Sequence, residues 1–232
     1  MVELQGKVAV ITGAKGGLGT WVTRAFLNAG AEVAGISRSI APGDFPDPRF
    51  LAIPASLSDG NSARRVIEAV VQKFKRVDIL VHLVGGFAGG SPVAETEDAV
   101  LETMLDLNLQ SAFRITRAAI PQMRRQGSGR ILAVGSRAAV DPAPGIAAYS
   151  ASKAALVSLI RTLALENKDA GITANIVLPG TMNTPANRAA MPDADRSKWV
   201  DPDQVANLLV YLASDAAAQV TGAAIPVYGR DA

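Results

Sequence analysis

Short β-branched runs alternate with helix-favouring segments along the 232-residue sequence, and no other feature restricts the possible folds as strongly. The strand-like runs are Lys7–Thr12, Glu32–Ser37, Arg49–Pro54, Val77–His82, Gly129–Ser136, Ile172–Leu178 and Ala224–Val227. The helical patterns are Thr20–Ala29, Gly60–Phe74, Glu97–Met123, Tyr149–Glu166 and Pro202–Ser214. This alternation predicts an α/β fold with a doubly wound parallel sheet, about seven strands with helices on both faces. No repeat or linker interrupts it, so we expect one domain over residues 1–232.

Composition excludes several classes of function. Hydrophobic residues make up 49% and charged residues 19%, enough material for a substantial core. The net charge is only +2, and few aromatics interleave with basic residues, which argues against nucleic-acid binding. The absence of cysteine excludes disulfides and thiolate metal sites, and the one histidine, His82, has no partner for a metal site. No apolar run approaches the ~20 residues that cross a bilayer, so we expect a soluble, cytoplasmic protein without a membrane partner.

A glycine-rich turn, Gly13-Ala14-Lys15-Gly16-Gly17-Leu18-Gly19, joins the first strand-like run to the first helix. Glycines let a backbone approach a phosphate, and the following helix supplies oriented N–H groups. The spacing of Gly13, Gly17 and Gly19 differs from the G-x-G-x-x-G of many dinucleotide enzymes. The alternative is a tight turn without a ligand, but its position between a strand and a helix favours phosphate binding.

Ser37 and Arg38 follow the second strand-like run, where NAD-binding proteins usually carry an acidic residue for the ribose hydroxyls. An arginine there can pair with a 2′-phosphate through two parallel hydrogen bonds. Lys15, in the glycine-rich turn, adds a second cation nearby. We therefore expect NADP(H) rather than NAD(H); the alternative is that both cations are ordinary surface residues.

Tyr149 and Lys153 lie four residues apart in a helical segment, so their side chains share one face. A nearby ammonium favours the phenolate and lowers the tyrosine pKa, which would give a general acid/base usable near neutral pH. The alternative is an ordinary helix surface. Ser136 lies at the carboxyl end of a strand-like run, where ligands bind in open parallel sheets. Asn108 falls in the middle of a helical pattern, an unfavourable place unless its amide is needed.

These residues together resemble the short-chain dehydrogenase/reductase family in order and spacing over essentially the full chain. The matching motifs are Thr12-Gly-x-x-x-Gly17-x-Gly19, Asn108, Ser136, Tyr149-x-x-x-Lys153 and Pro179-Gly180. The resemblance implies a Rossmann-type fold, a nicotinamide cofactor, a small-molecule substrate, and a homotetramer or homodimer.

The resemblance also implies a role for each matching residue. Tyr149 would give a proton to a carbonyl or take one from an alcohol, and Lys153 would hold the nicotinamide ribose and lower the tyrosine pKa. Ser136 would hydrogen-bond the substrate oxygen, Asn108 would anchor a water, and Thr184 would hold the carboxamide. The other expected cofactor-binding residues are Gly13, Lys15, Gly17, Leu18, Gly19, Ser37, Arg38, Gly85, Pro179 and Gly180.

The chain departs from the family pattern at two places. The family commonly has Asn-Asn-Ala-Gly where this chain has His82-Leu83-Val84-Gly85, and Ser56 replaces an aspartate after the third strand. These changes leave the contacts to the adenosine side open. We expect His82 to be structural rather than catalytic.

A second resemblance, to the dihydropteridine reductases within that family, concerns substrate binding. It rests on Gly85–Gly90, on Asn183-Thr184-Pro185-x-Asn187-Arg188 and on Met191–Trp199. It implies that Phe87, beside Ser136 and Tyr149, stacks on a flat bicyclic substrate, and that residues 181–200 form a mobile substrate loop. Against it, those enzymes prefer NADH and lack the serine.

Three functions therefore stand in order. The first is an NADP(H)-dependent oxidoreductase acting on a carbonyl or a secondary alcohol. The second is reduction of a quinonoid dihydropterin. The third, favoured least because Tyr149 and Lys153 are both present, is a nucleotide-binding protein that has lost catalysis.

Overall fold

One parallel sheet, in the order β3-β2-β1-β4-β5-β6-β7, organises the computed structural model, which describes residues 3–230. Its strands are β1 Val8–Thr12, β2 Glu32–Ser37, β3 Phe50–Pro54, β4 Ile79–His82, β5 Gly129–Val134, β6 Ile172–Pro179 and β7 Ala224–Val227. The strand order reverses between β1 and β4, and such reversals place a crevice at the carboxyl ends of the strands. The predicted α/β fold with a doubly wound sheet is confirmed.

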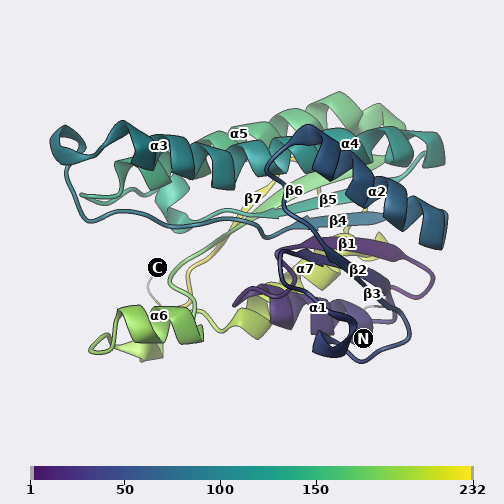
Figure 1. Ribbon diagram of the computed structural model, residues 1–232, viewed down its shortest axis with the longest axis horizontal. Helices are drawn as coiled ribbons and strands as arrows, with labels where there is room; N and C mark the ends of the chain where they lie inside the picture. Colours follow the sequence, from purple (N-terminus) through teal and green to yellow (C-terminus); the bar gives the residue numbers. More distant parts are fainter. Residues whose placement is uncertain (1–2, 231–232) are drawn as a thin grey trace.

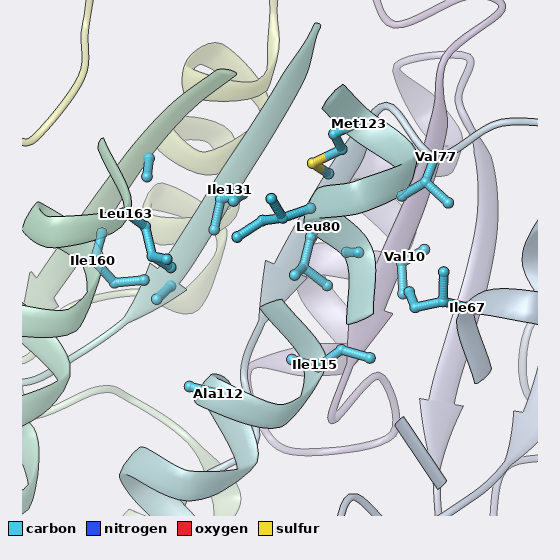
Figure 2. Close-up of a cluster of buried hydrophobic side chains, with 14 of the residues drawn as sticks. Val10, Ile67, Val77, Leu80, Ala112, Ile115, Met123, Ile131, Ile160 and Leu163 are labelled. Carbon is cyan, nitrogen blue, oxygen red and sulfur yellow. The ribbon is translucent and has the colours of Figure 1, made fainter. Parts of the chain in front are cut away.

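Helices cover both faces of the sheet (Figure 1). One face carries α2 Gly60–Phe74, α4 Ser111–Gln126 and α5 Ala147–Asn167; the other carries α1 Gly19–Asn28 and α7 Pro202–Ala213. Strands β1, β4 and β5 contribute Val10, Leu80 and Ile131 to the first face, where they meet buried side chains of α2, α4 and α5 (Figure 2). Because both faces are covered, strands β1, β4 and β6 are buried along their whole length rather than on one face only.

The long helical pattern predicted from Glu97 to Met123 is not one α-helix. Helix α3 runs over Asp98–Leu105, a π-helical stretch follows over Asp106–Gln110, and α4 then continues to Gln126. The chain is helical over the predicted range, but the pattern did not predict the π-helical stretch in its middle. The break coincides with Asn108, whose buried side chain binds the chain outside the helix.

The segment expected to be a substrate loop over residues 181–200 contains a short helix, α6 Pro185–Ala190, and a turn of 3₁₀ helix at Arg196–Lys198. Strand β6 ends at Pro179, and the Gly180 N–H donates to the Val227 oxygen at 2.9 Å. The two ends of the segment are joined, because the Val200 N–H donates to the Thr181 oxygen at 2.8 Å. Residues 181–200 thus contain helical turns and are hydrogen-bonded at their two ends, so they are not an irregular loop.

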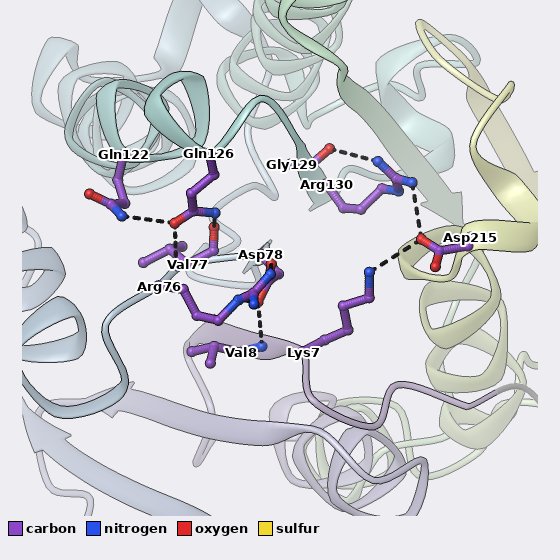
Figure 3. Close-up of polar contacts among 10 residues, drawn as sticks. All are labelled: Lys7, Val8, Arg76, Val77, Asp78, Gln122, Gln126, Gly129, Arg130 and Asp215. Atoms are coloured by element: carbon purple, nitrogen blue, oxygen red, sulfur yellow. Dashed lines mark hydrogen bonds and ion pairs between the residues drawn. The ribbon is translucent and has the colours of Figure 1, made fainter.

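Polar contacts fix the opposite, amino-terminal edge of the sheet (Figure 3). The buried Asp78 carboxylate accepts from the Val8 N–H at 2.9 Å and from the Arg76 guanidinium at 2.6 and 2.7 Å. The Asp215 carboxylate lies 3.4 Å from the Lys7 ammonium and 3.5 Å from the Arg130 guanidinium. These contacts tie together the starts of β1, β4 and β5, whereas ligands of open parallel sheets bind at the opposite, carboxyl edge.

Candidate active site

The glycine-rich turn after β1 folds so tightly that its two ends require glycine. Gly13 has a positive φ of 73°, and a Cβ there would lie 3.1 Å from the carbonyl carbon of Leu83. A Cβ on Gly19 would lie 1.9 Å from the Gly13 oxygen. Helix α1 begins at Gly19 without a side-chain cap from Leu18, and the N–H groups of Thr20, Trp21 and Val22 donate to backbone oxygens of Gly16 and Leu18, which leaves the N–H groups of Gly17, Leu18 and Gly19 for a ligand. Turn and helix end form a cradle that fits the pyrophosphate of a dinucleotide.

The two predicted cations, Lys15 and Arg38, lie where this turn meets the end of β2. The Lys15 N–H donates to the Ser37 hydroxyl at 3.1 Å, which ties the turn to the strand. The Lys15 ammonium lies 2.9 Å from the Asp44 carboxylate and donates to the Ser39 oxygen at 3.1 Å. Arg38 is exposed. Asp44 was not among the predicted site residues, because nothing local in the sequence links the segment after Arg38 to the glycine-rich turn.

Tyr149, Lys153 and Ser136 meet at the carboxyl end of β5. Tyr149 and Lys153 share one side of α5, with the Lys153 ammonium 5.9 Å from the centre of the tyrosine ring. That buried ammonium donates to the Val134 oxygen at 3.2 Å. The Ser136 side chain faces the Tyr149 phenol closely enough to lower the pKa of that phenol, and its hydroxyl oxygen accepts from the Ala138 N–H at 3.2 Å. The structure therefore brings three of the four predicted catalytic side chains to one place.

The pKa of Tyr149 moves in the direction opposite to the sequence expectation. Burial raises the pKa of the phenol above its ordinary value of 10.0, and the hydrogen bond with Ser136 offsets only part of that rise. Burial also lowers the pKa of the Lys153 ammonium from 10.5 to about 8. The expected lowering of the tyrosine pKa by Lys153 is wrong for this structure, because the ammonium contacts Val134 and burial dominates. At neutral pH the phenol holds its proton and the ammonium is charged.

Asn108 lies in the π-helical stretch and is fully buried. Its Nδ2 donates to the Gly86 oxygen at 3.1 Å and to the Ser152 hydroxyl at 3.0 Å, while its Oδ1 accepts from the Gly86 N–H at 2.9 Å. The amide therefore joins the loop after β4 to α5. A Cβ on Gly85 would lie 2.7 Å from Asn108 Oδ1 and 3.2 Å from Lys153 Nζ, so a side chain there would displace both. Single π-helical turns are frequent at functional sites.

His82 forms a buried link between the sheet and the π-helical stretch. The Ser111 hydroxyl donates to the Leu107 oxygen at 2.6 Å, so it must accept from His82 Nε2–H at 3.2 Å. His82 Nδ1 then accepts from the Thr12 hydroxyl at 2.9 Å. Burial, and secondarily the charge of Lys153, lower the pKa of His82 from 6.5 to about 3. The ring is therefore neutral at physiological pH.

Phe87 and Thr184 border the cluster from two sides. The Phe87 ring meets the Tyr149 ring edge-on, with centres 5.0 Å apart, and 67% of Phe87 is exposed. The buried Thr184 lies against the glycine-rich turn, 3.5 Å from where a Cβ on Gly17 would be. Its hydroxyl oxygen accepts from the Asn187 N–H at 3.3 Å and so caps α6. The side chain predicted to hold a carboxamide thus also starts the helix of the 181–200 segment.

Residues 3–230 contain neither a cluster of metal ligands nor a candidate membrane span. In that part of the chain, no group of three or more histidine, cysteine, aspartate or glutamate residues is placed to hold a metal ion. Nor is any described helix both long and apolar enough to cross a membrane.

A dinucleotide cradle beside a tyrosine, a serine and a buried lysine defines a nucleotide-dependent oxidoreductase of the α/β class. Residues 7–195 match the family model described as short chain dehydrogenase. The chain belongs to the short-chain dehydrogenase family and is an NAD(P)-dependent enzyme of that family.

Similar proteins cover this chain from end to end. The 3-oxoacyl-(acyl-carrier-protein) reductase FabG of Thermotoga maritima is 32% identical over 98% of this chain and 98% of its own. The 2-dehydro-3-deoxy-D-gluconate 5-dehydrogenase of Pseudoalteromonas atlantica is 31% identical over 98% and 96%. The crystal structure of the 3-ketoacyl-(acyl-carrier-protein) reductase of Brucella melitensis, complexed with NADH, superposes with a TM-score of 0.89. It is 30% identical and covers 99% of this chain and all of its own.

Proposed function

We propose that this protein transfers hydride between NADP(H) and a carbonyl or secondary alcohol. The observation that carries the proposal is the meeting of Tyr149, Ser136 and Lys153 beside the glycine cradle, at the carboxyl edge of the sheet. The names of the relatives, two ketoacyl reductases and a sugar-acid dehydrogenase, fit this reaction class and differ in substrate.

The chain's own residues supply the proton and the positioning. When bound, the nicotinamide gives or accepts the hydride. In reduction, the protonated Tyr149 phenol gives its proton to the carbonyl oxygen as the carbonyl carbon receives the hydride, and an alcohol results. Ser136 donates a hydrogen bond to the same oxygen and stabilises the charge that develops there. Lys153 holds the ribose, and the hydrogen bond with Ser136 favours the phenolate that remains.

Several further residues would hold the cofactor in place. The turn from Gly13 to Gly19 would bind the pyrophosphate through backbone N–H groups. Thr184 would bind the carboxamide, and Pro179-Gly180, where β6 ends, would border the nicotinamide. Asn108 would anchor a water through its backbone, since its side chain is already bound to Gly86 and Ser152.

The preference for NADP(H) rests on Arg38, exposed at the end of β2. A guanidinium there matches the charge and geometry of a 2′-phosphate. Arg38→Asp is expected to reverse the ratio of catalytic efficiencies toward NADH. An unchanged ratio would show that Arg38 does not contact the phosphate.

Reduction of a quinonoid dihydropterin is the second candidate. It is supported by the exposed Phe87 ring, which lies edge-on to Tyr149 and offers an apolar face to a flat substrate. NADPH oxidation measured with this pterin and with a panel of ketones separates the two reactions.

Replacement of Tyr149 by phenylalanine tests the proposed chemistry. Tyr149→Phe removes only the phenolic oxygen, so we expect turnover to fall by at least 1000-fold, the upper part of the range for a lost acid/base, while NADPH still binds. Tyr211→Phe, at a 41% exposed tyrosine on α7, is the matched control and should keep full activity. Turnover retained by Tyr149→Phe would refute the mechanism. Tight NADPH binding without turnover of any carbonyl or pterin would instead favour the non-catalytic alternative.

We also propose a homotetramer or homodimer. Its support is a set of exposed apolar side chains on the helices of one face, Phe113 on α4 at 48% and Leu165 on α5 at 73%. Light scattering after size exclusion gives the mass, and a monomer at micromolar concentration would contradict the proposal.

A further inference from the structure

The segment after β2 is fastened to the glycine-rich turn by an ion pair that the family pattern does not describe. The Lys15 ammonium lies 2.9 Å from Asp44 Oδ1, and it also donates to the Ser39 oxygen at 3.1 Å. Lys15 is the one charged residue of the turn from Gly13 to Gly19. The charge of that cation is therefore already balanced by a carboxylate within the protein.

Asp44 is held in place by its own turn and not by Lys15 alone. Asp44 Oδ2 accepts from the Ala41 N–H at 2.8 Å, and the Asp44 N–H donates to the Ala41 oxygen at 3.1 Å. The next residue, Phe45, is buried and packs on Phe50 of β3 with ring centres 4.9 Å apart. The hydrogen bond from Lys15 keeps the pKa of Asp44 below its ordinary value, so the carboxylate is charged at neutral pH. A fixed negative charge thus lies beside the place proposed for the 2′-phosphate.

We infer that Asp44 is a specificity-determining residue that weakens binding of the 2′-phosphate and so moves cofactor preference toward NAD(H). The inference rests on the proposed nicotinamide site. A 2′-phosphate must either draw Lys15 away from Asp44 or lie next to an ionised carboxylate, and both cost free energy that NAD(H) does not incur. Lys15 and Arg38 are the two cations of this region. The charge of Lys15 is balanced by Asp44, and Arg38 is then the only one of the two whose charge no neighbouring carboxylate balances in the structure.

The test is nucleotide binding by the full chain, measured by calorimetry without any turnover. Asp44→Asn removes the charge, and its amide oxygen can still accept from the Ala41 N–H. The probes are adenosine 2′,5′-bisphosphate and AMP, with NADPH and NADH as the complete cofactors. Asp47→Asn is the matched control, because Asp47 forms a similar ion pair with Arg49, at 2.6 Å, in the same segment.

Asp44→Asn is expected to tighten binding of adenosine 2′,5′-bisphosphate and NADPH about tenfold, since one full negative charge is removed near a phosphate. AMP and NADH should change less than twofold, and Asp47→Asn should change none of the four. Asp44→Ser, whose hydroxyl can also accept from Ala41, should reproduce the result, and thermal melting checks that each variant is folded.

Three outcomes would overturn the inference, and they differ in whether the proposed function fails as well. If the wild type binds NADPH and NADH but neither Asp44 variant alters their ratio, Asp44 has no influence on specificity and the proposed function survives. If the wild type binds neither cofactor, the proposed function fails together with the inference. Equal tightening of AMP and the bisphosphate would also count against it, because a general electrostatic effect would then explain the change.

Discussion

The burial of His82 predicts a specific dependence of folding stability on pH. The ring is 1% exposed and is enclosed by the Thr12 and Ser111 hydroxyls, with the Lys153 charge nearby. Its folded pKa is about 3, against an ordinary value of 6.5. As pH falls below 6.5, the unfolded chain binds a proton that the folded protein excludes. The contribution of His82 to stability is therefore complete above pH 6.5 and is lost progressively as pH falls toward 3.

The size of this effect follows from the difference between the two pKa values. Each pH unit between them lowers the free energy of unfolding by about 1.4 kcal/mol, so the loss between pH 7 and pH 5 is about 2 kcal/mol. His82 is the only histidine, so no other imidazole titrates in this range. Lys153, with a folded pKa of about 8, stays protonated in both the folded and the unfolded protein below pH 7, so it does not make the free energy of unfolding depend on pH there.

The assay is urea unfolding at pH 7, 6 and 5, followed by tryptophan fluorescence and by circular dichroism. The variant is His82→Asn, which replaces the imidazole by an amide that cannot titrate and leaves every carboxylate unchanged. Between pH 7 and 5 the wild type should lose about 2 kcal/mol more than the variant. Equal losses in the two proteins would refute the reasoning, since they would mean that the folded protein accepts a proton on His82 near its ordinary pKa.

Two further pairs of substitutions, each a test variant with its control, examine the glycine-rich turn and the capping of α2. Gly19→Ala would place a Cβ 1.9 Å from the Gly13 oxygen, so we expect loss of more than 1 kcal/mol of stability and at least tenfold weaker NADPH binding, by melting and titration. Gly43→Ala, with nothing within 4 Å of the added Cβ, should match the wild type. At the start of α2, the Ser62 N–H donates to the Asp59 carboxylate at 2.8 Å. Asp59→Ala removes this hydrogen bond and should lower the free energy of unfolding by about 1 kcal/mol, whereas Asp59→Asn, which can still accept it, should keep the wild-type stability.

The regular elements could be predicted because their signals are local. Strands Glu32–Ser37 and Ala224–Val227 and helix Gly60–Phe74 have the predicted bounds, since periodicity and turn residues mark both ends of each. The π-helical stretch could not be predicted in this way. It depends on Asn108 reaching Gly86 and Ser152, and no local periodicity reveals contacts with a loop and a helix elsewhere in the chain.

In the candidate site, too, the features with local sequence signals could be predicted and those that depend on distant contacts could not. The order and spacing of the motifs placed Tyr149 and Lys153 on one face of a helix, and the structure has them there. The direction of the tyrosine pKa depends on how deeply the phenol is buried, which helix spacing does not reveal. The ion pair between Lys15 and Asp44 is another contact that only the folded chain creates.

His82, at which this chain departs from the family pattern, links two strands to a helix. Thr12 ends β1, His82 ends β4, and Ser111 begins α4, so one neutral imidazole with a donor on one side and an acceptor on the other joins three elements. Ser111 passes the link to the Leu107 oxygen in the π-helical stretch, next to Asn108. Protonation of the ring would leave two donors facing Thr12 and Ser111, and the Thr12 hydroxyl could then no longer donate to it. The low pKa of His82 thus preserves the bond from Thr12 that links β1 to β4, whereas the bond from Nε2–H to Ser111 can form in either protonation state.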